Sequence, residues 1–183
     1  MNREEWLTKA GTDLELVILN KTDLIVPPYC VSVGFPKGAR GRKKAIGQCW
    51  STEVAQDEKF HIFISPELAD PLRVLDVLLH ELIHATVGTQ EKHKGKFIEV
   101  AKACGLKKPW TATTAGEDLL PRLNQISTDL KAYPHGALIP RELEKPPGSR
   151  LRLWICRCNV KVRVASDDFL AACGKCGANF ERK

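Results

Sequence analysis

The sequence predicts an α+β fold, with a small antiparallel sheet and apolar helices followed by a linker and a C-terminal unit built around four cysteines. Three observations predict this arrangement. β-rich runs lie in the first third of the chain, apolar runs with helical spacing follow them, and four of the seven cysteines crowd into the last 28 residues. The length of 183 residues suits one domain with an appendage, since domains usually hold roughly 100 to 150 residues.

The composition favours a folded chain outside the membrane. Hydrophobic residues make up 43% and charged residues 27%, which is close to globular averages and excludes a fully disordered protein. No run approaches the roughly 18 apolar residues of a membrane span. The start, MNREEWLTKA, lacks the apolar region of a secretory signal, so we expect a cytoplasmic protein. The net charge of +6 favours a polyanionic partner, although many proteins of similar charge have none.

The first elements in the chain are expected to be a helix and three strands. A short helix is predicted at 4–9 and an apolar run follows at 14–19. Alternating or β-branched patterns predict strands at 29–35, 45–50 and 59–65.

A basic loop separates the first two expected strands. Its glycines and the absence of any acid indicate either a solvated turn or a segment that contacts phosphates. Its cations are Lys37, Arg40, Arg42, Lys43 and Lys44.

Three helices are expected after the strands. Ser65-Pro66 and Asp70-Pro71 both have the pattern of a helix start, with a capping oxygen followed by proline. The run at 71–86 has almost no polar face, so we expect a helix in the middle of the domain. Helical spacing also predicts helices at 94–104 and 118–130.

The rest of the chain is expected to hold a linker and a second unit. Prolines and glycines from Tyr133 onward deny helix and strand hydrogen bonds, which predicts an extended linker. We therefore expect a domain at 1–130, a linker at 131–150 and a small unit at 151–183. This unit has too few apolar residues to fold without a stabilising cross-link such as a metal ion or a disulfide.

His80-Glu81-Leu82-Ile83-His84 is an HExxH motif. On a helix, the four-residue spacing places both imidazoles on one face, where they can bind one metal ion. Glu81 then lies beside the metal and can take a proton from a metal-bound water. Two histidines and a glutamate in an apolar helix are costly without such partners, so the motif predicts a catalytic zinc site.

The third protein ligand of such a site must come from elsewhere, because a catalytic zinc usually has three. The metzincin pattern needs glycine three and histidine six residues after His84, but Val87 and Gln90 occupy those places. His93 follows the helix and is the favoured ligand. Glu99, on the next expected helix, is the alternative.

The other histidines and three isolated cysteines have simpler interpretations. We expect His61, in a strand, and His135, in the linker, to be structural or exposed. Cys30, Cys49 and Cys104 are interpreted as small buried apolar residues.

The C-terminal cysteines form two close pairs with the spacing of a zinc ribbon. The four are Cys156, Cys158, Cys173 and Cys176. Clustering of this kind in a reducing compartment argues for metal ligation over disulfides. Glycines 174 and 177 permit tight turns, and strands are expected at 161–165 and 178–181. The chain is therefore expected to bind two zinc ions, although manganese or cobalt can occupy the same histidine ligands.

The second unit is also basic. Residues 150–183 carry eight Lys or Arg against three Asp or Glu. Arg157, Lys161 and Arg163 are the residues of this unit that we expect to contact nucleic-acid phosphates.

With these motifs the chain resembles the SprT-like (SprT/Spartan) family of zinc metalloproteases, especially the short members encoded by bacteriophages. The resemblance rests on FISPEL at 63–68, VLDVLLHELIHA at 74–85, HKGKF at 93–97 and the terminal CxC and CxxC pairs, in this order. One departure is Lys94, which stands between the third histidine and the glycine that commonly follows it directly in the family.

The resemblance implies a zincin-like core with His80, His84 and His93 as zinc ligands and Glu81 as catalytic base. It implies an endopeptidase that degrades proteins on DNA, including DNA-protein crosslinks, and that is often switched on by DNA. The expected partners are protein substrates and single-stranded or structured DNA bound without sequence preference, in the host cytoplasm if the protein is viral. The alternative is a non-proteolytic zinc-ribbon protein that binds nucleic acid or the transcription machinery.

Overall fold

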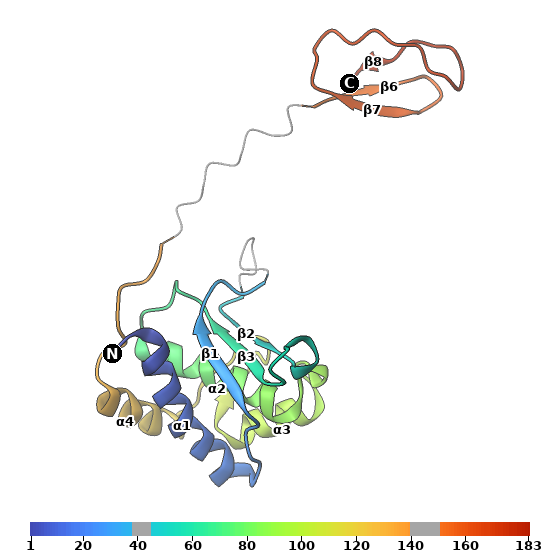
Figure 1. Cartoon of the computed structure of the whole chain (residues 1–183). Coiled ribbons are helices and arrows are strands. Elements are labelled where there is room, and N and C mark those ends of the chain that lie inside the picture. Colours follow the sequence, from blue (N-terminus) through green and yellow to red (C-terminus); the bar gives the residue numbers. More distant parts are fainter. Residues whose placement is uncertain (38–44, 140–150) are drawn as a thin grey trace. The chain divides into compact units, whose positions relative to one another are not determined.

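The computed structural model describes residues 1–37, 45–139 and 151–183. The chain divides into two compact units, Met1–Ile139 and Pro140–Lys183, which are drawn in Figure 1 and described separately below. Within the described residues, no helix is long and apolar enough to cross a membrane. The architecture is α+β, as predicted.

The first unit begins with helix α1 (Arg3–Thr22), which is longer than the sequence pattern predicts. Asn2 and Glu5 start it with a reciprocal capping box, in which the Glu5 N–H donates to Asn2 Oδ1 at 2.8 Å. The helix runs without a break through Gly11, joining the expected short helix to the apolar run that follows. Gly11 lies against the hydroxyl of Tyr29, and a side chain there would collide with it. The tertiary contact therefore outweighs the helix propensity of glycine.

A three-stranded sheet packs on the helices. It consists of β1 (Tyr29–Val33), β2 (Gly47–Trp50) and β3 (Phe60–Ile64), in the order β1-β3-β2. The expectation of an antiparallel sheet is wrong, because β2 is antiparallel to β3 whereas β1 is parallel to it. β3 is the central strand, and its Ile62 and Ile64 are fully buried. β2 forms one edge of this sheet, where its outer backbone groups are free of strand partners among the described residues.

Helix α2 (Pro71–Val87) is the central element of the unit. Asp70 caps it by accepting the Arg73 N–H at 2.8 Å, and the helix ends before Gly88, whose φ of 90° suits glycine. Nearly every residue from Val74 to Ala85 is buried. In Figure 1, α2 lies behind the sheet, and α1 contacts both α2 and β1. The other expected start, Ser65-Pro66, is a turn rather than a helix, with the Leu68 N–H donating to the Ser65 carbonyl.

Shorter elements complete the first unit. They are η1 (Thr52–Val54), η2 (Thr89–Glu91), α3 (Gly95–Ala103), α4 (Leu120–Leu130) and the pair β4 (Leu106–Lys107) and β5 (Thr114–Ala115). Helices α3 and α4 agree with the predicted ranges within two residues at each end.

The chain after α4 remains attached to the first unit as far as Ile139. Tyr133 is 5% exposed and meets Trp6 edge-on, with ring centroids 5.0 Å apart. The guanidinium of Arg3 donates to the carbonyls of Pro134 and Gly136 at 2.9 and 2.7 Å. The rest of the expected linker, residues 140–150, lies outside the described residues.

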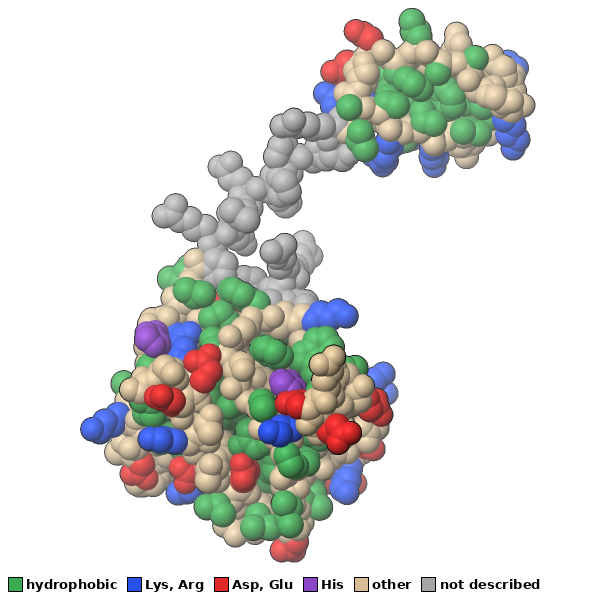
Figure 2. Space-filling model, in the orientation of Figure 1, with side chains coloured by type: hydrophobic (Ala, Val, Ile, Leu, Met, Phe, Trp, Pro, Cys, Tyr) green, Lys and Arg blue, Asp and Glu red, His purple; other side chains and the backbone are tan. Residues whose placement is uncertain are grey.

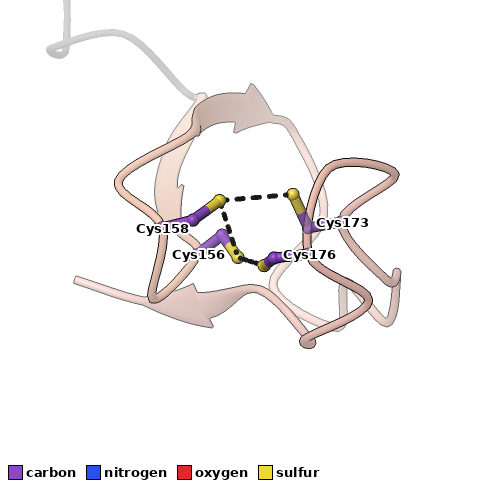
Figure 3. Close-up of side chains that lie close together, drawn as sticks. All are labelled: Cys156, Cys158, Cys173 and Cys176. Atoms are coloured by element: carbon purple, nitrogen blue, oxygen red, sulfur yellow. Dashed lines mark hydrogen bonds between the residues drawn. The ribbon is translucent and has the colours of Figure 1, made fainter.

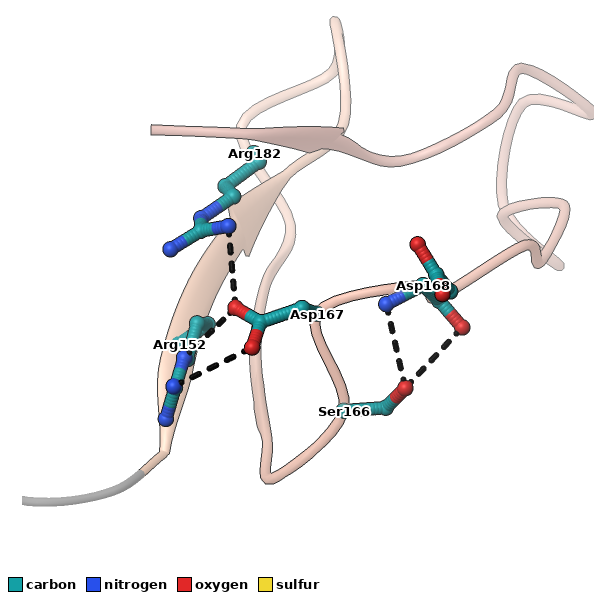
Figure 4. A network of polar contacts seen from close by, with 5 residues as sticks. All are labelled: Arg152, Ser166, Asp167, Asp168 and Arg182. Atoms are coloured by element: carbon teal, nitrogen blue, oxygen red, sulfur yellow. Dashed lines mark hydrogen bonds and ion pairs between the residues drawn. The ribbon is translucent and has the colours of Figure 1, made fainter.

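The second unit is a small antiparallel sheet. Strands β6 (Arg152–Ile155), β7 (Lys161–Val164) and β8 (Glu181–Arg182) lie in the order β7-β6-β8. The Asp167 carboxylate connects β6 to β8. It accepts two hydrogen bonds from Arg152 and lies 2.9 Å from the Arg182 guanidinium (Figure 4). Such a partly exposed ion network contributes only modestly to stability.

Candidate metal centres

Three imidazoles converge above the middle of α2. His80 and His84 lie one turn apart on the helix, and His93 returns to them from the turn between η2 and α3. The Nε2 atom of His93 lies 3.1 Å from that of His80 and 3.2 Å from that of His84. Phe97, which is fully buried, packs against all three rings and holds their orientation.

The spacing of the three nitrogens fits a shared metal ion. Zinc–nitrogen bonds of about 2.0–2.1 Å place tetrahedral ligand atoms about 3.3 Å apart. A network of hydrogen bonds is a poorer explanation, because the single Nε2–H that His93 can carry points directly at only one of the two neighbouring nitrogens. Burial lowers the pKa of all three imidazoles, with charge repulsion from neighbouring histidines adding to it for His80 and His84, each at about 3. Neutral imidazoles are the form that binds metal.

A second layer of contacts orients His80. Its Nδ1 atom lies 2.9 Å from the hydroxyl of Thr113, and Arg73 donates to the Thr113 carbonyl at 2.7 Å. With Nδ1–H donating to the hydroxyl, Nε2 is left bare for a metal, which is the usual arrangement around metal-binding histidines. Neither Thr113 nor Arg73 was predicted from the sequence, because His80 and Thr113 are 33 positions apart and meet only in the fold.

Glu81 is buried beside the three histidines, with 6% of its surface exposed. Burial raises the pKa of its carboxyl to about 8, while a hydrogen bond from the Cys49 backbone N–H opposes that shift. Gly47 also approaches it closely, since a Cβ there would lie 2.5 Å from Glu81 Oε1. Strand β2 thus packs its backbone directly on the carboxyl group, which fixes where the carboxyl can point.

The histidines and Glu81 open onto a cleft of about 540 Å³. One wall is formed by β2 and the residues before it, and another by Thr111 to Thr113. Lys37, Arg73 and Lys92 also border this cleft. Because β2 is an edge strand, its outer backbone groups have no strand partner among the described residues, although one of them, the Cys49 N–H, bonds Glu81.

The geometry favours His93 over Glu99 as the third ligand. Glu99 is exposed on α3 and is outside the cluster of three histidines.

We expect His93→Ala to lower the zinc content of the intact chain by about one equivalent, because two remaining histidines leave the site with too few ligands. Metal analysis after dialysis measures this, with Glu99→Ala as the matched control. Loss of zinc from the control and not from His93→Ala would reverse the ranking.

The four C-terminal cysteines also form a cluster (Figure 3). Cys156 Sγ lies 3.2 Å from Cys176 Sγ, and Cys158 Sγ lies 3.6 Å from the sulfurs of Cys156 and Cys173. These separations are too long for disulfides, which have S–S bonds of about 2.05 Å. They approach the roughly 3.8 Å edge of a zinc tetrahedron with 2.3 Å bonds. The cluster is therefore a candidate structural zinc site.

Two backbone turns of similar form present the sulfurs. A residue with positive φ follows each cysteine pair, Asn159 at 65° and Gly177 at 71°. The N–H of Ala178 lowers the pKa of Cys176 to about 6. The N–H of Cys158 lowers the pKa of Cys156, but burial and hydrogen bonds with other sulfurs raise it, to about 12 overall. Backbone donors aimed at sulfur favour thiolates, the form that binds zinc.

The expected phosphate-contacting residues that the structure describes belong to two different units. Lys37 borders the histidine cleft, and its backbone N–H donates to Gln48 Oε1 at 2.7 Å. Arg157, Lys161 and Arg163 are exposed on the second unit. The remaining loop residues, Arg40, Arg42, Lys43 and Lys44, lie outside the described residues.

The isolated cysteines differ from one another. Cys104 is buried, as predicted, with 2% of its surface exposed. Cys30 and Cys49 are only partly buried. Cys49 still packs against the hydrophobic core, whereas Cys30 does not belong to it. Cys49 lies against Glu81, and Cys30 lies beside His61 on the sheet. His135 is exposed.

Comparisons with known proteins give no family assignment. No family model matches the chain, and no curated protein or solved structure matches it. The two candidate metal centres and the resemblance of the motifs are therefore the features that indicate a function.

Proposed function

We propose that this protein is a zinc-dependent endopeptidase acting on DNA-associated proteins. The observation that carries the proposal is the convergence of three Nε2 atoms beside the buried carboxyl of Glu81 in a cleft bordered by an edge strand. His80, His84 and His93 hold the zinc ion. Zinc bound there polarises a carbonyl group and lowers the pKa of water.

The chain's own residues then have separate roles. The free edge of β2 pairs with an extended substrate and aligns it along the cleft, as in other β-strand addition modes. The Glu81 carboxylate takes the proton of the attacking water and passes it to the leaving amine, a general acid–base role. Thr113 keeps His80 in the tautomer that leaves Nε2 free.

Hydrolysis of an unfolded protein by the zinc-loaded chain tests the proposal. Internal cleavage that stops on chelation and returns with zinc supports it. An intact substrate, with both metal sites filled and with or without single-stranded DNA, would leave the non-proteolytic zinc-ribbon alternative as the better explanation.

The association with DNA is proposed from the second unit. Lys161 and Arg163 alternate with Val162 and Val164 along β7, so both cations stand exposed on the same face of the strand. Figure 2 shows Lys and Arg side chains around the rim of this unit. No recognition helix is present in the described part of the unit, which favours contacts with the phosphate backbone over sequence readout.

Replacing either Lys161 or Arg163 by glutamine is expected to weaken single-stranded DNA binding. Each phosphate contact releases counterions, so each loss should reduce the slope of log affinity against log salt by nearly one unit. Fluorescence anisotropy at several salt concentrations measures the slope, and Lys9→Gln, an exposed lysine on α1, serves as control. Equal slopes for all variants would remove this strand from the DNA interface.

A further inference from the structure

The outer face of the sheet carries a third cluster of metal-binding side chains. Side chains alternate along each strand, and Val31 and Ile62 are buried in the core on the helix side. Their neighbours Cys30 and His61 therefore face the opposite side. They are direct partners in the parallel register of β1 and β3, so the backbone itself sets a thiol beside an imidazole.

Asp57 completes the cluster from the turn before β3. This turn is closed by the Glu58 N–H, which donates to the Ala55 carbonyl at 3.3 Å. Asp57 Oδ1 lies 2.9 Å from His61 Nε2. One ligand atom from each of Cys30, Asp57 and His61 lies within 4.8 Å of the other two.

The geometry is compatible with one tetrahedral ion. Bonds of about 2.0–2.3 Å from zinc to nitrogen, oxygen and sulfur require ligand atoms about 3.3–3.6 Å apart. The Asp57 and His61 side chains are 45% and 35% exposed, so both have room to turn toward the sulfur. The hydrogen bond from His61 is the main influence that lowers the pKa of Asp57.

We propose that Cys30, Asp57 and His61 form a third metal site, selective for zinc-like transition ions. A thiolate with an imidazole disfavours magnesium and calcium, which prefer oxygen ligands. Three protein ligands leave one tetrahedral position for water or another ligand. Asp57 and His61 also line an open hollow, together with Trp50, Gln56 and Phe63. The sheet separates this site from Glu81, because that carboxyl contacts Gly47 and Cys49 of β2 from the helix side of the sheet.

This site should bind zinc more weakly than the two centres described above. Its ligands are partly exposed, it has fewer thiolates than the four-cysteine cluster, and it lacks the buried histidine cage. The bound ion joins an edge strand to the turn that precedes the central strand. The proposal does not depend on proteolysis, because it concerns residues on the opposite face of the sheet from Glu81.

Equilibrium dialysis of the full-length chain against increasing zinc tests the proposal. Wild type should keep two equivalents at low free zinc and gain a third as zinc rises. Cys30→Ser and Asp57→Asn should each weaken the third equivalent at least about tenfold, the low end of losses seen even for residues that only support a ligand. The matched controls Glu58→Gln and His135→Ala should retain it. A wild type that stays at two equivalents, or a Cys30→Ser variant that still binds three, overturns the site.

A second measurement avoids mutation altogether. Iodoacetamide should alkylate Cys30 of the wild type at low free zinc, and added zinc should slow that reaction at least about tenfold, because a bound thiolate is no longer a free nucleophile. Peptide mapping identifies the modified cysteine. Alkylation of Cys30 at the same rate in both conditions contradicts the proposal even if the variants misfold.

Discussion

Replacement of Glu81 by glutamine is expected to lower peptide hydrolysis at least about a hundredfold while the zinc content remains unchanged. The loss corresponds to the low end for removing a general base. Glutamine has nearly the same shape and can still accept the Cys49 N–H, so the packing against Gly47 should persist. Its amide cannot take the proton of the attacking water. The measurement is the rate of cleavage of an unfolded protein, together with metal analysis of the same sample.

Glu99→Gln is the matched control for this experiment. It makes the same chemical change on an exposed face of α3, outside the histidine cluster, and should cleave at the wild-type rate. Cleavage by Glu81→Gln at the wild-type rate would remove Glu81 from the mechanism. Loss of both cleavage and zinc in that variant would instead assign Glu81 to holding the metal centre together.

Most of the helices and strands were predicted from local patterns, because the residues that determine such an element are neighbours in the sequence. The apolar run at 71–86 and the Asp70-Pro71 start located α2, and alternation located β3. The direction of β1 relative to β3 was not predictable in this way, since pairing direction depends on the path of the chain between them. The unbroken α1 was missed because Gly11 is stabilised by its contact with Tyr29, far along the sequence.

The same division applies to the candidate sites. Spacing alone placed His80 beside His84 and paired the cysteines, because a helix turn and a tight turn fix those distances. Thr113 and Gly47 were missed, since their roles come from contacts across the fold. The partnership of Cys30 with His61 follows from strand register. No sequence pattern joins two residues that pair only when the strands meet.

The replacement Cys173→Ser is expected to unfold the second unit and to remove about one equivalent of zinc. The unit's described residues, 151–183, are fewer than the roughly 40 that usually fold without a metal or disulfide. Its apolar packing is limited, with Trp154, Phe169 and Phe180 in a row at centroid separations of 5.5 and 6.0 Å. Zinc contributes about 10–16 kcal/mol to comparable small domains, so losing the ion removes most of what stabilises the fold.

Two-dimensional NMR of the intact chain can separate this effect by region. Amide signals of 151–183 should collapse to unfolded positions in Cys173→Ser, whereas signals of the first unit should stay dispersed, because its core, as far as the structure describes it, consists of residues of the first unit. Asp167→Asn is the control within the unit. It removes the ion pairs of Asp167 with Arg152 and Arg182. Because the side chains involved are 32–56% exposed, the loss in free energy of unfolding should be within about 1 kcal/mol per pair. The amide signals of this variant should therefore stay at folded positions. Dispersed signals in Cys173→Ser would mean that the strands and aromatic row suffice without zinc. Collapse in Asp167→Asn as well would show that the ion network, and not zinc alone, holds the unit together.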